Sequence, residues 1–202
     1  MLKTKIAVLV SGGGTNLQAL IDAQNAGIIK SGQIDLVISN NADAYALTRA
    51  KNAGIDTAVV SKKELGDQRV FEETLIEVLM SKGIELIILA GFMCILSESF
   101  TSKYPKRIIN VHPSLIPSFC GKGFYGLHVH EAALEYGVKV TGATVHFVNE
   151  IPDGGEIILQ KAVEIKEGDT PEILQKRVME EAEWKILPWA AELVSAKLAE
   201  NR

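Results

Sequence analysis

The chain has 202 residues, of which 47% are hydrophobic and 23% are charged, and its net charge is −4. These values are ordinary for a globular protein with a packed core, and they exclude a disordered or fibrous chain as a whole. The acidic balance argues against a surface built for nucleic acid, which usually carries a basic stripe.

Short apolar runs alternate with helical patterns as far as Val111. Such strands, separated by helices, predict a parallel sheet that is covered on both faces. The expected class is a Rossmann-like, doubly wound α/β fold. The predicted strands are Lys5–Val10, Asp35–Ser39, Thr57–Val60, Ile84–Leu89 and Arg107–Val111, and the predicted helices are Asn16–Ala26, Ala42–Ala53 and Arg69–Lys82.

The pattern changes after about residue 138. Two β-rich segments, Lys139–Asn149 and Glu156–Glu164, are joined by a short Pro- and Gly-containing loop, which predicts an antiparallel addition to the sheet. A long helix is expected over Thr170–Asn201, with Thr170 as its N-cap and a break or kink at Pro188. No linker or repeat is visible, so residues 1–202 are expected to form a single domain.

The cysteines and the apolar runs indicate where the protein works. Cys94 and Cys120 are too few for a disulfide framework, and we expect free thiols in a reducing compartment. The longest apolar run, Leu86–Leu96, is too short to span a bilayer, which takes about 20 residues. The expectation is a cytoplasmic protein that binds neither membrane nor nucleic acid.

A glycine-rich loop, Ser11–Asn16, links the first predicted strand to the first helix. Glycines allow close backbone approach to a ligand, and the free N–H groups and positive dipole of the helix start favour a phosphate. The dinucleotide fingerprint would need glycine where Leu17 stands, and no P-loop pattern occurs. A phosphate monoester on a small substrate is therefore favoured, and a plain tight turn is the alternative.

Polar residues stand at the end of the strand predicted over Arg107–Val111. Asn110 and His112 are two residues apart and should project together, and an amide beside an imidazole suits acyl chemistry. Asp153 lies in a Pro-Asp-Gly-Gly loop, where a turn role and a catalytic role both remain open.

The other histidines and cysteines offer weaker alternatives. His128, His130 and His146 show no recognised metal-ligand spacing, so no metal is expected. Nothing in the sequence marks a base for Cys120 as a nucleophile.

Four ordered motifs resemble the phosphoribosylglycinamide formyltransferases, which are folate-dependent enzymes of purine synthesis: Ser11–Gln18, Ala90–Met93, Asn110–Pro117 and Asp153–Gly155. The resemblance covers nearly the whole chain. It implies transfer of the formyl group of 10-formyltetrahydrofolate to the amine of phosphoribosylglycinamide in de novo purine biosynthesis, through a tetrahedral intermediate and without a metal. It also implies a phosphate-binding part at about 1–105, a folate and catalytic part at about 106–202, and a monomer or homodimer.

The resemblance assigns roles to individual residues. Asn110 and protonated His112 would stabilise the oxyanion, and Asp153 would raise the pKa of His112. The substrate would be bound by Gly14, Thr15, Asn16 and Glu183, and the folate by Arg69, Met93, Cys94, Ile95, Leu96 and Asn149.

The sequence departs from the usual family pattern in three places. Cys94 stands where an arginine is common, Trp184 stands where a histidine is common, and the Ser118–Gly126 segment is long. The main alternative is a formyltetrahydrofolate deformylase, which usually carries an N-terminal regulatory domain. The first predicted strand already begins at residue 5. A methionyl-tRNA formyltransferase and a catalytically silent nucleotide-binding module are further alternatives.

Overall fold

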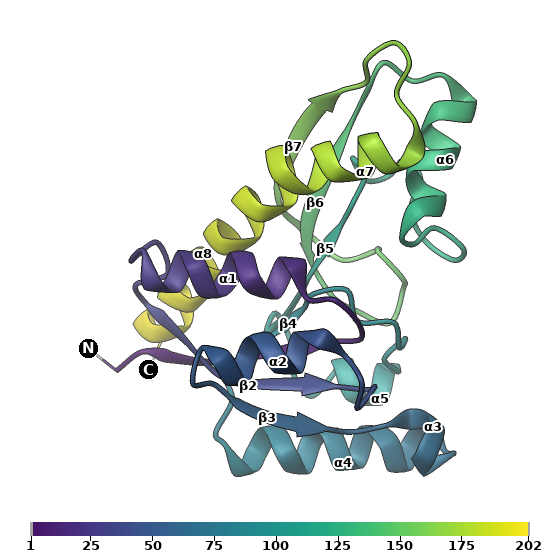
Figure 1. The fold of residues 1–202 in the computed structure, drawn as a ribbon. Helices are drawn as coiled ribbons and strands as arrows, with labels where there is room; N and C mark the ends of the chain where they lie inside the picture. The colour runs from purple at the N-terminus through teal and green to yellow at the C-terminus, as the bar shows by residue number, and fades with distance from the viewer. Residues whose placement is uncertain (1, 202) are drawn as a thin grey trace.

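The computed structural model describes residues 2–201 and contains one seven-stranded sheet, in the order β3-β2-β1-β4-β5-β6-β7 (Figure 1). The strands are β1 (Thr4–Val10), β2 (Gly32–Ser39), β3 (Asp56–Val59), β4 (Leu86–Leu89), β5 (Ile108–His112), β6 (Val140–Phe147) and β7 (Ile157–Glu164). Neighbouring strands from β3 to β5 are parallel, whereas β6 and β7 are antiparallel to their neighbours. The predicted fold class is confirmed.

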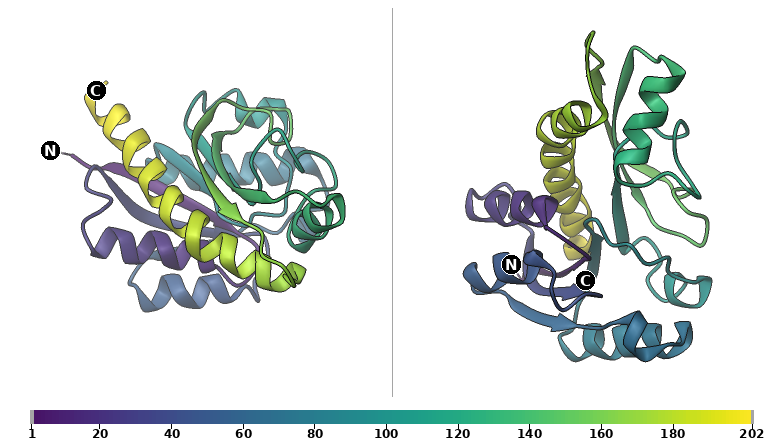
Figure 2. Two further views of the ribbon diagram at one scale, coloured as in Figure 1. Left: turned by 90° about the horizontal axis from the view of Figure 1, so that it is seen from above. Right: turned by 45° about the vertical axis from the view of Figure 1, so that its right-hand side comes forward.

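Helices cover both faces of this sheet (Figure 2). They are α1 (Thr15–Asn25), α2 (Tyr45–Asn52), α3 (Lys62–Leu65), α4 (Gln68–Ser81), α5 (Glu98–Thr101), α6 (Leu127–Tyr136), α7 (Pro171–Val178), the π-helix η1 (Met179–Glu183) and α8 (Trp184–Glu200). The buried side chains of α1, α2 and α8 belong to one core cluster, and those of α4 and α5 to a second.

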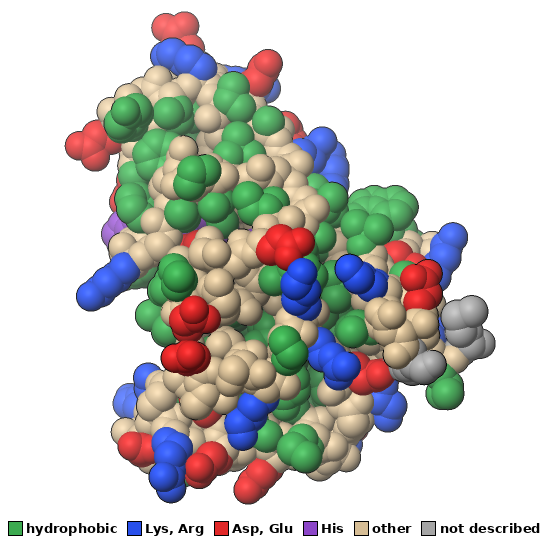
Figure 3. All heavy atoms as spheres, turned by 180° about the vertical axis from the view of Figure 1, so that it is seen from behind, with side chains coloured by type: hydrophobic (Ala, Val, Ile, Leu, Met, Phe, Trp, Pro, Cys, Tyr) green, Lys and Arg blue, Asp and Glu red, His purple; other side chains and the backbone are tan. Residues whose placement is uncertain are grey.

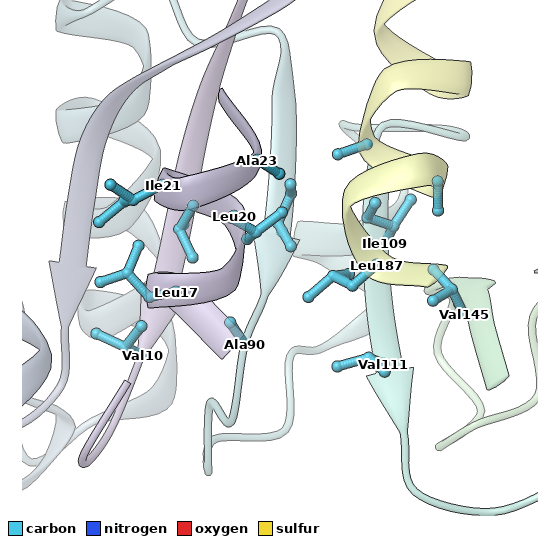
Figure 4. Packing of buried hydrophobic residues seen from close by; sticks show 14 of the residues in the cluster. Val10, Leu17, Leu20, Ile21, Ala23, Ala90, Ile109, Val111, Val145 and Leu187 are labelled. Atoms are coloured by element: carbon cyan, nitrogen blue, oxygen red, sulfur yellow. The ribbon is translucent and has the colours of Figure 1, made fainter. Parts of the chain in front are cut away.

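Strand β1 explains why the central strands read as continuous apolar runs. Ile6, Val8 and Val10 belong to the cluster with α1 and α8, whereas Ala7 and Leu9 belong to the cluster with α4. Successive side chains of a strand point to opposite faces, so a strand that is covered on both sides needs apolar residues throughout. Figure 4 shows α1 and α8 packing side chains such as Leu20 and Leu187 against the sheet.

Several features differ from the sequence prediction, and the short helices α3 and α5 were not predicted. Helix α6 was not predicted; it lies between Gly126 and Gly137, and Gly137 ends it in the left-handed conformation. Pro188 does not break the C-terminal helix, because α8 continues through it. The irregularity lies earlier, in the π-helix η1, whose wider turn is a common way to accommodate a distortion. Thr170 does cap α7, accepting a hydrogen bond from the Ile173 amide.

The described surface carries both signs of charge. On the face in Figure 3, Lys and Arg side chains are interspersed with Asp and Glu side chains. Within residues 2–201, no helix is both long and apolar enough to cross a membrane. Cys94 and Cys120 are free thiols.

The packing of α8 predicts how two leucines on the same helix differ. Leu187 is fully buried, whereas Leu193 is 50% exposed. Leu187→Ala should lower the free energy of unfolding by about 2–5 kcal/mol, because it removes buried methyl groups and leaves a cavity. The matched Leu193→Ala should lower it by about 0.5 kcal/mol or less. Urea denaturation of both variants measures the difference, and equal losses would contradict this account of the core.

Candidate active site

Strands β1 and β4 are neighbours at the centre of the sheet, and the chain leaves them toward opposite edges. Ligands of open α/β sheets bind beyond the carboxyl ends of the strands at such a switch point. The segments that follow β1, β4 and β5 contain three of the four motifs singled out in the sequence. The β6–β7 loop carries the fourth and reaches His112 through Asp153.

The glycine loop after β1 is fixed against α2. Gly14 has a φ of 73°, and a Cβ at this position would lie 2.6 Å from the Ala46 Cβ. The Ala46 amide donates to the Gly12 carbonyl (3.0 Å), and Arg49 Nε donates to the Gly13 carbonyl (2.8 Å). Arg49 was not singled out in the sequence. The sequence alone does not show that α2 packs on the glycine loop, so it could not indicate that Arg49 contacts this loop.

The N-terminus of α1 lies beside the π-helix η1. Asn16 Nδ2 donates to Glu183 Oε2 (2.7 Å), and Thr15 Oγ1 donates to Met179 Sδ (3.9 Å). Asn16 Oδ1 is buried and has no hydrogen-bond partner within the described residues. In the same part of the chain, α1 has no side-chain cap, so its first N–H groups are available to a ligand. The structure therefore brings Gly14, Thr15, Asn16 and Glu183 together.

Glu183 is a carboxyl group held in the protein interior. Its residue is 6% exposed, and burial raises its pKa to about 7, although the hydrogen bond from Asn16 acts in the opposite direction. Beside it, a cleft of about 440 Å³ is lined by residues that include Thr15, Gln18, Arg49 and Trp184. Trp184, one of the departures from the family pattern, thus borders the cleft next to the glycine loop.

The three predicted catalytic residues meet at the end of β5. Asp153 Oδ2 lies 3.5 Å from His112 Nδ1 and accepts a hydrogen bond from the Gly121 amide (2.8 Å). Asp153 Oδ1 lies 3.5 Å from His146 Nε2. His146 in turn contacts Asn110, which it faces across the β5–β6 pair. A chain of contacts therefore connects Asn110, His146, Asp153 and His112.

His146 is the member of this cluster that sequence reasoning missed, having weighed it only as a metal ligand. Its Nδ1 lies 2.8 Å from the Phe147 carbonyl and must donate to it. In the neutral ring, Nε2 is then an acceptor for Asn110 Nδ2, 3.2 Å away. This bond uses one of the two amide hydrogens of Asn110 and fixes the orientation of the amide. The sequence did place His146 in a predicted strand. It could not show that this strand pairs with β5 so that His146 lies opposite Asn110.

His112 has two distinct ring nitrogens. Nε2 lies 2.8 Å from the Phe119 carbonyl and donates to it, so Nδ1 is the nitrogen that gains or loses a proton in this conformation. Burial lowers the pKa of His112, and His146 adds to this, whereas the Asp153 charge and the Phe119 carbonyl raise it. Asp153 thus acts as the resemblance implies, but the net pKa is below the ordinary value because burial has the larger effect.

Asp153 is ionised despite its surroundings. Burial raises its pKa, but the neighbouring His146 and His112 rings and the hydrogen bond from the Gly121 amide together bring the pKa below its ordinary value. The backbone of Asp153 has a φ of 56°, a left-handed conformation that Asp tolerates better than most residues.

A cavity of about 130 Å³ opens beside this cluster. Its lining consists of apolar side chains with the polar cluster at one side: Leu89, Phe92, Cys94, Ile95, Leu96, Asn110, His146, Val148, Asn149, Glu150, Ile151, Pro152 and Asp153. Four of the predicted folate residues therefore line it, namely Cys94, Ile95, Leu96 and Asn149. The Cys94 thiol accepts a hydrogen bond from Asn40 Nδ2 (3.0 Å).

Two predicted folate residues lie outside this lining. The Met93 side chain is exposed, and the Met93 backbone amide donates a hydrogen bond to Ser11 Oγ (2.8 Å). The Arg69 side chain is 83% exposed and pairs with Glu73 at 3.2 Å. Arg69 lies on α4, and Met93 adjoins the cavity-lining Cys94 in sequence, but neither residue lines the cavity.

The remaining histidines lie on α6. His128 is exposed and pairs with Glu131 (2.8 Å), whereas His130 is fully buried and its pKa is lowered to about 4 by burial and by His112. No group of three or more His, Cys, Asp or Glu residues between positions 2 and 201 is arranged to hold a metal ion.

Comparison with known proteins identifies the class to which this fold and site belong. Residues 4–190 match the formyl transferase family, so the chain is a member of that family. The resemblance inferred from the four motifs is confirmed by the relatives. The chain is 45% identical over 184 residues to the phosphoribosylglycinamide formyltransferase of Haemophilus influenzae, covering 91% of this chain and 84% of that protein.

Two further relatives show the breadth of the similarity. The chain is 48% identical over 202 residues to the trifunctional purine biosynthetic protein adenosine-3 of Homo sapiens, covering 98% of this chain. It spans only 19% of that protein's length. A crystal structure of glycinamide ribonucleotide transformylase 1 from Symbiobacterium toebii is similar with a TM-score of 0.90 and 43% identity, over 96% of this chain and 89% of that one.

The buried Glu183 predicts a pH-dependent stability. Because its folded-state pKa of about 7 exceeds the ordinary 4.5, the folded protein binds more protons between these values. Stability from this group is therefore present below pH 4.5 and is lost as the pH rises to about 7. Relative to Glu183→Gln, the wild type should lose unfolding free energy across that window. The exposed Glu181→Gln is the control, and parallel curves for wild type and Glu183→Gln would refute the assignment.

The Asp153–His112 pair predicts a direction of titration. Since the Asp153 charge raises the pKa of His112, Asp153→Asn should lower that pKa further. An NMR titration of the His112 ring protons in wild type and variant measures the change. Asp43→Asn, which removes an exposed carboxylate, should leave the pKa of His112 unchanged. A higher His112 pKa in Asp153→Asn would show that the pair is not coupled as described.

Proposed function

We propose that the chain transfers the formyl group of 10-formyltetrahydrofolate to the amine of phosphoribosylglycinamide, in de novo purine biosynthesis. One observation carries the proposal: Asn110, His146, Asp153 and His112 form a connected cluster at the wall of a mostly apolar cavity. Membership of the formyl transferase family and the names of the relatives support the same reaction.

The cavity fits one end of a folate. Its volume of about 130 Å³ is below the roughly 300–1,000 Å³ of sites that enclose a whole drug-sized ligand. We infer that it takes the flat ring system, while the rest of the molecule extends outward past the exposed Arg69 and Met93. Leu89, Ile95 and Leu96 would contact the ring faces, and polar groups of Asn149 to Asp153 would bind its edge. The bound folate supplies the formyl group.

Asn110 and His112 would act on the charge that develops when an amine attacks a formyl carbon. The amide hydrogen of Asn110 that is not used by His146 can donate to the developing oxyanion. His112 can take up a proton at Nδ1, where the Asp153 carboxylate stabilises the imidazolium. No step requires a covalent bond to the protein.

The phosphorylated substrate would occupy the cleft beside α1. The free amides at the start of α1 suit its phosphate. Thr15, Asn16 and Gly14 would bind that group, and Arg49 adds a positive charge next to the loop. Glu183, held by Asn16, would contact the ribose.

The cellular setting is also a proposal. We propose that the protein works in the cytoplasm, as a monomer or a homodimer. The free thiols of Cys94 and Cys120 support a reducing compartment.

The function is tested by mixing the protein with 10-formyltetrahydrofolate and following loss of the formyl group by absorbance. We expect turnover only when phosphoribosylglycinamide is present. His112→Ala should reduce kcat by about 10²–10⁴-fold, because it removes the group that moves the proton. Its KM for the folate should change little, since His112 is not among the cavity-lining residues.

Two outcomes would contradict this assignment. Formyl loss without the glycinamide would indicate hydrolysis, and full activity of His112→Ala would remove the cluster from the reaction. The exposed His128→Ala, on α6, is the matched control and should retain wild-type turnover.

A further inference from the structure

We propose that Glu72 is a positioning residue for the folate pocket: it holds the segment Ile95–Ser97 in the place where that segment forms the cavity wall. The inference rests on the proposed function, because it deepens the account of the same pocket. Glu72 itself is not among the residues that line the cavity. It would act through the chain segment that it binds.

Glu72 is an unusual residue for the buried side of a helix. It lies on α4 between Phe71 and Leu75, both fully buried, and it is itself only 4% exposed. A buried carboxylate is costly unless hydrogen bonds compensate for its lost hydration. Such a group is retained where its hydrogen bonds hold something in place.

Two of the three compensating donors belong to Ser97, in the segment after β4, and the third is Gln68 on α4 itself. Glu72 Oε1 accepts from the Ser97 amide (2.7 Å) and from Gln68 Nε2 (2.5 Å), and Oε2 accepts from Ser97 Oγ (2.5 Å). Gln68 Nε2 also donates to the Ile95 carbonyl (3.2 Å). An ionised carboxylate only accepts hydrogen bonds, and every group that faces it here is a donor.

The segment held in this way is irregular and partly exposed, although Leu96 is buried in the core and the Ser97 carbonyl accepts hydrogen bonds from the Phe100 and Thr101 amides. Ile95 is 68% exposed and Met93 is 59% exposed, and the segment contains neither helix nor strand. Its first half is tied by the Met93 amide to Ser11 and by Cys94 to Asn40. At the other end of the segment, Ser97 is attached to Glu72 by two hydrogen bonds. Because Ile95 and Leu96 line the cavity, the shape of the folate site depends on this attachment.

The test compares Glu72→Ala with Glu77→Ala, which removes an exposed carboxylate from the same helix. In the formyl transfer assay, Glu72→Ala should raise the KM for the folate by about tenfold, because the donors of Ser97 and Gln68 lose their partner and the wall shifts. The kcat should stay within about threefold, and the KM for the glycinamide should be unchanged. Glu72→Gln retains an acceptor oxygen and should recover most of the folate KM.

A second measurement does not depend on turnover. Hydrogen exchange of the Ser97 amide should be faster in Glu72→Ala than in wild type or Glu77→Ala. If wild type does not transfer formyl groups, the proposed function fails. Exchange at Ser97, with binding of 10-formyltetrahydrofolate followed by fluorescence, still decides the role of Glu72.

Three results would overturn the inference. The first is that Glu72→Ala has the same KM for the folate and the same Ser97 exchange rate as Glu77→Ala. Another is a lower melting temperature and a lower kcat with an unchanged folate KM, which would mark a purely structural residue. If Glu72→Ala does not fold, Ser97→Ala replaces it, since it removes one hydrogen bond to Oε2. The third contradicting result would then be a KM for the folate that is unchanged in Ser97→Ala.

Discussion

The site depends on one partly buried carboxylate, that of Asp153, which lies between two imidazole rings. Asp153 lies within 3.5 Å of both His112 and His146 and also accepts a hydrogen bond from the Gly121 amide. These contacts tie together β5, β6, the segment after β5 and the β6–β7 loop. Because a partly buried carboxylate is stabilised by such partners, the contacts of Asp153 couple the positions of the four segments.

The backbone around Asp153 is shaped for this contact. Asp153 is in the left-handed region, and a Cβ on Gly155 would lie 1.7 Å from the Phe147 carbonyl. The Asp-Gly-Gly motif is thus a requirement of the loop geometry. The same proximity sets the pKa of His112, where burial and the carboxylate act in opposite directions.

The second constraint joins the two ends of the chain. Thr4 Oγ1 on β1 donates to the Ser195 carbonyl on α8, and Asn16 on α1 donates to Glu183 on η1. The π-helix occurs at the point where the C-terminal helices pass the glycine loop. The glycine-loop end of the site therefore contains residues from both ends of the sequence, whereas the cavity end is built from the middle. Both ends of the site follow strands of the same sheet, β1 and β5.

The sequence by itself determined the fold class, because continuous apolar strands and intervening helices are read from local periodicity. It also determined the four motifs, and with them Asn110, His112 and Asp153 as candidates. Only the tertiary structure decided that His146 contacts Asn110, that Arg49 lies on the glycine loop and that Glu72 accepts a hydrogen bond from Ser97. These contacts join residues far apart in the chain, and strand pairing and helix docking bring them together. Spacing along one sequence carries no record of such pairs, because the hydrogen bonds that define them form only in the folded protein.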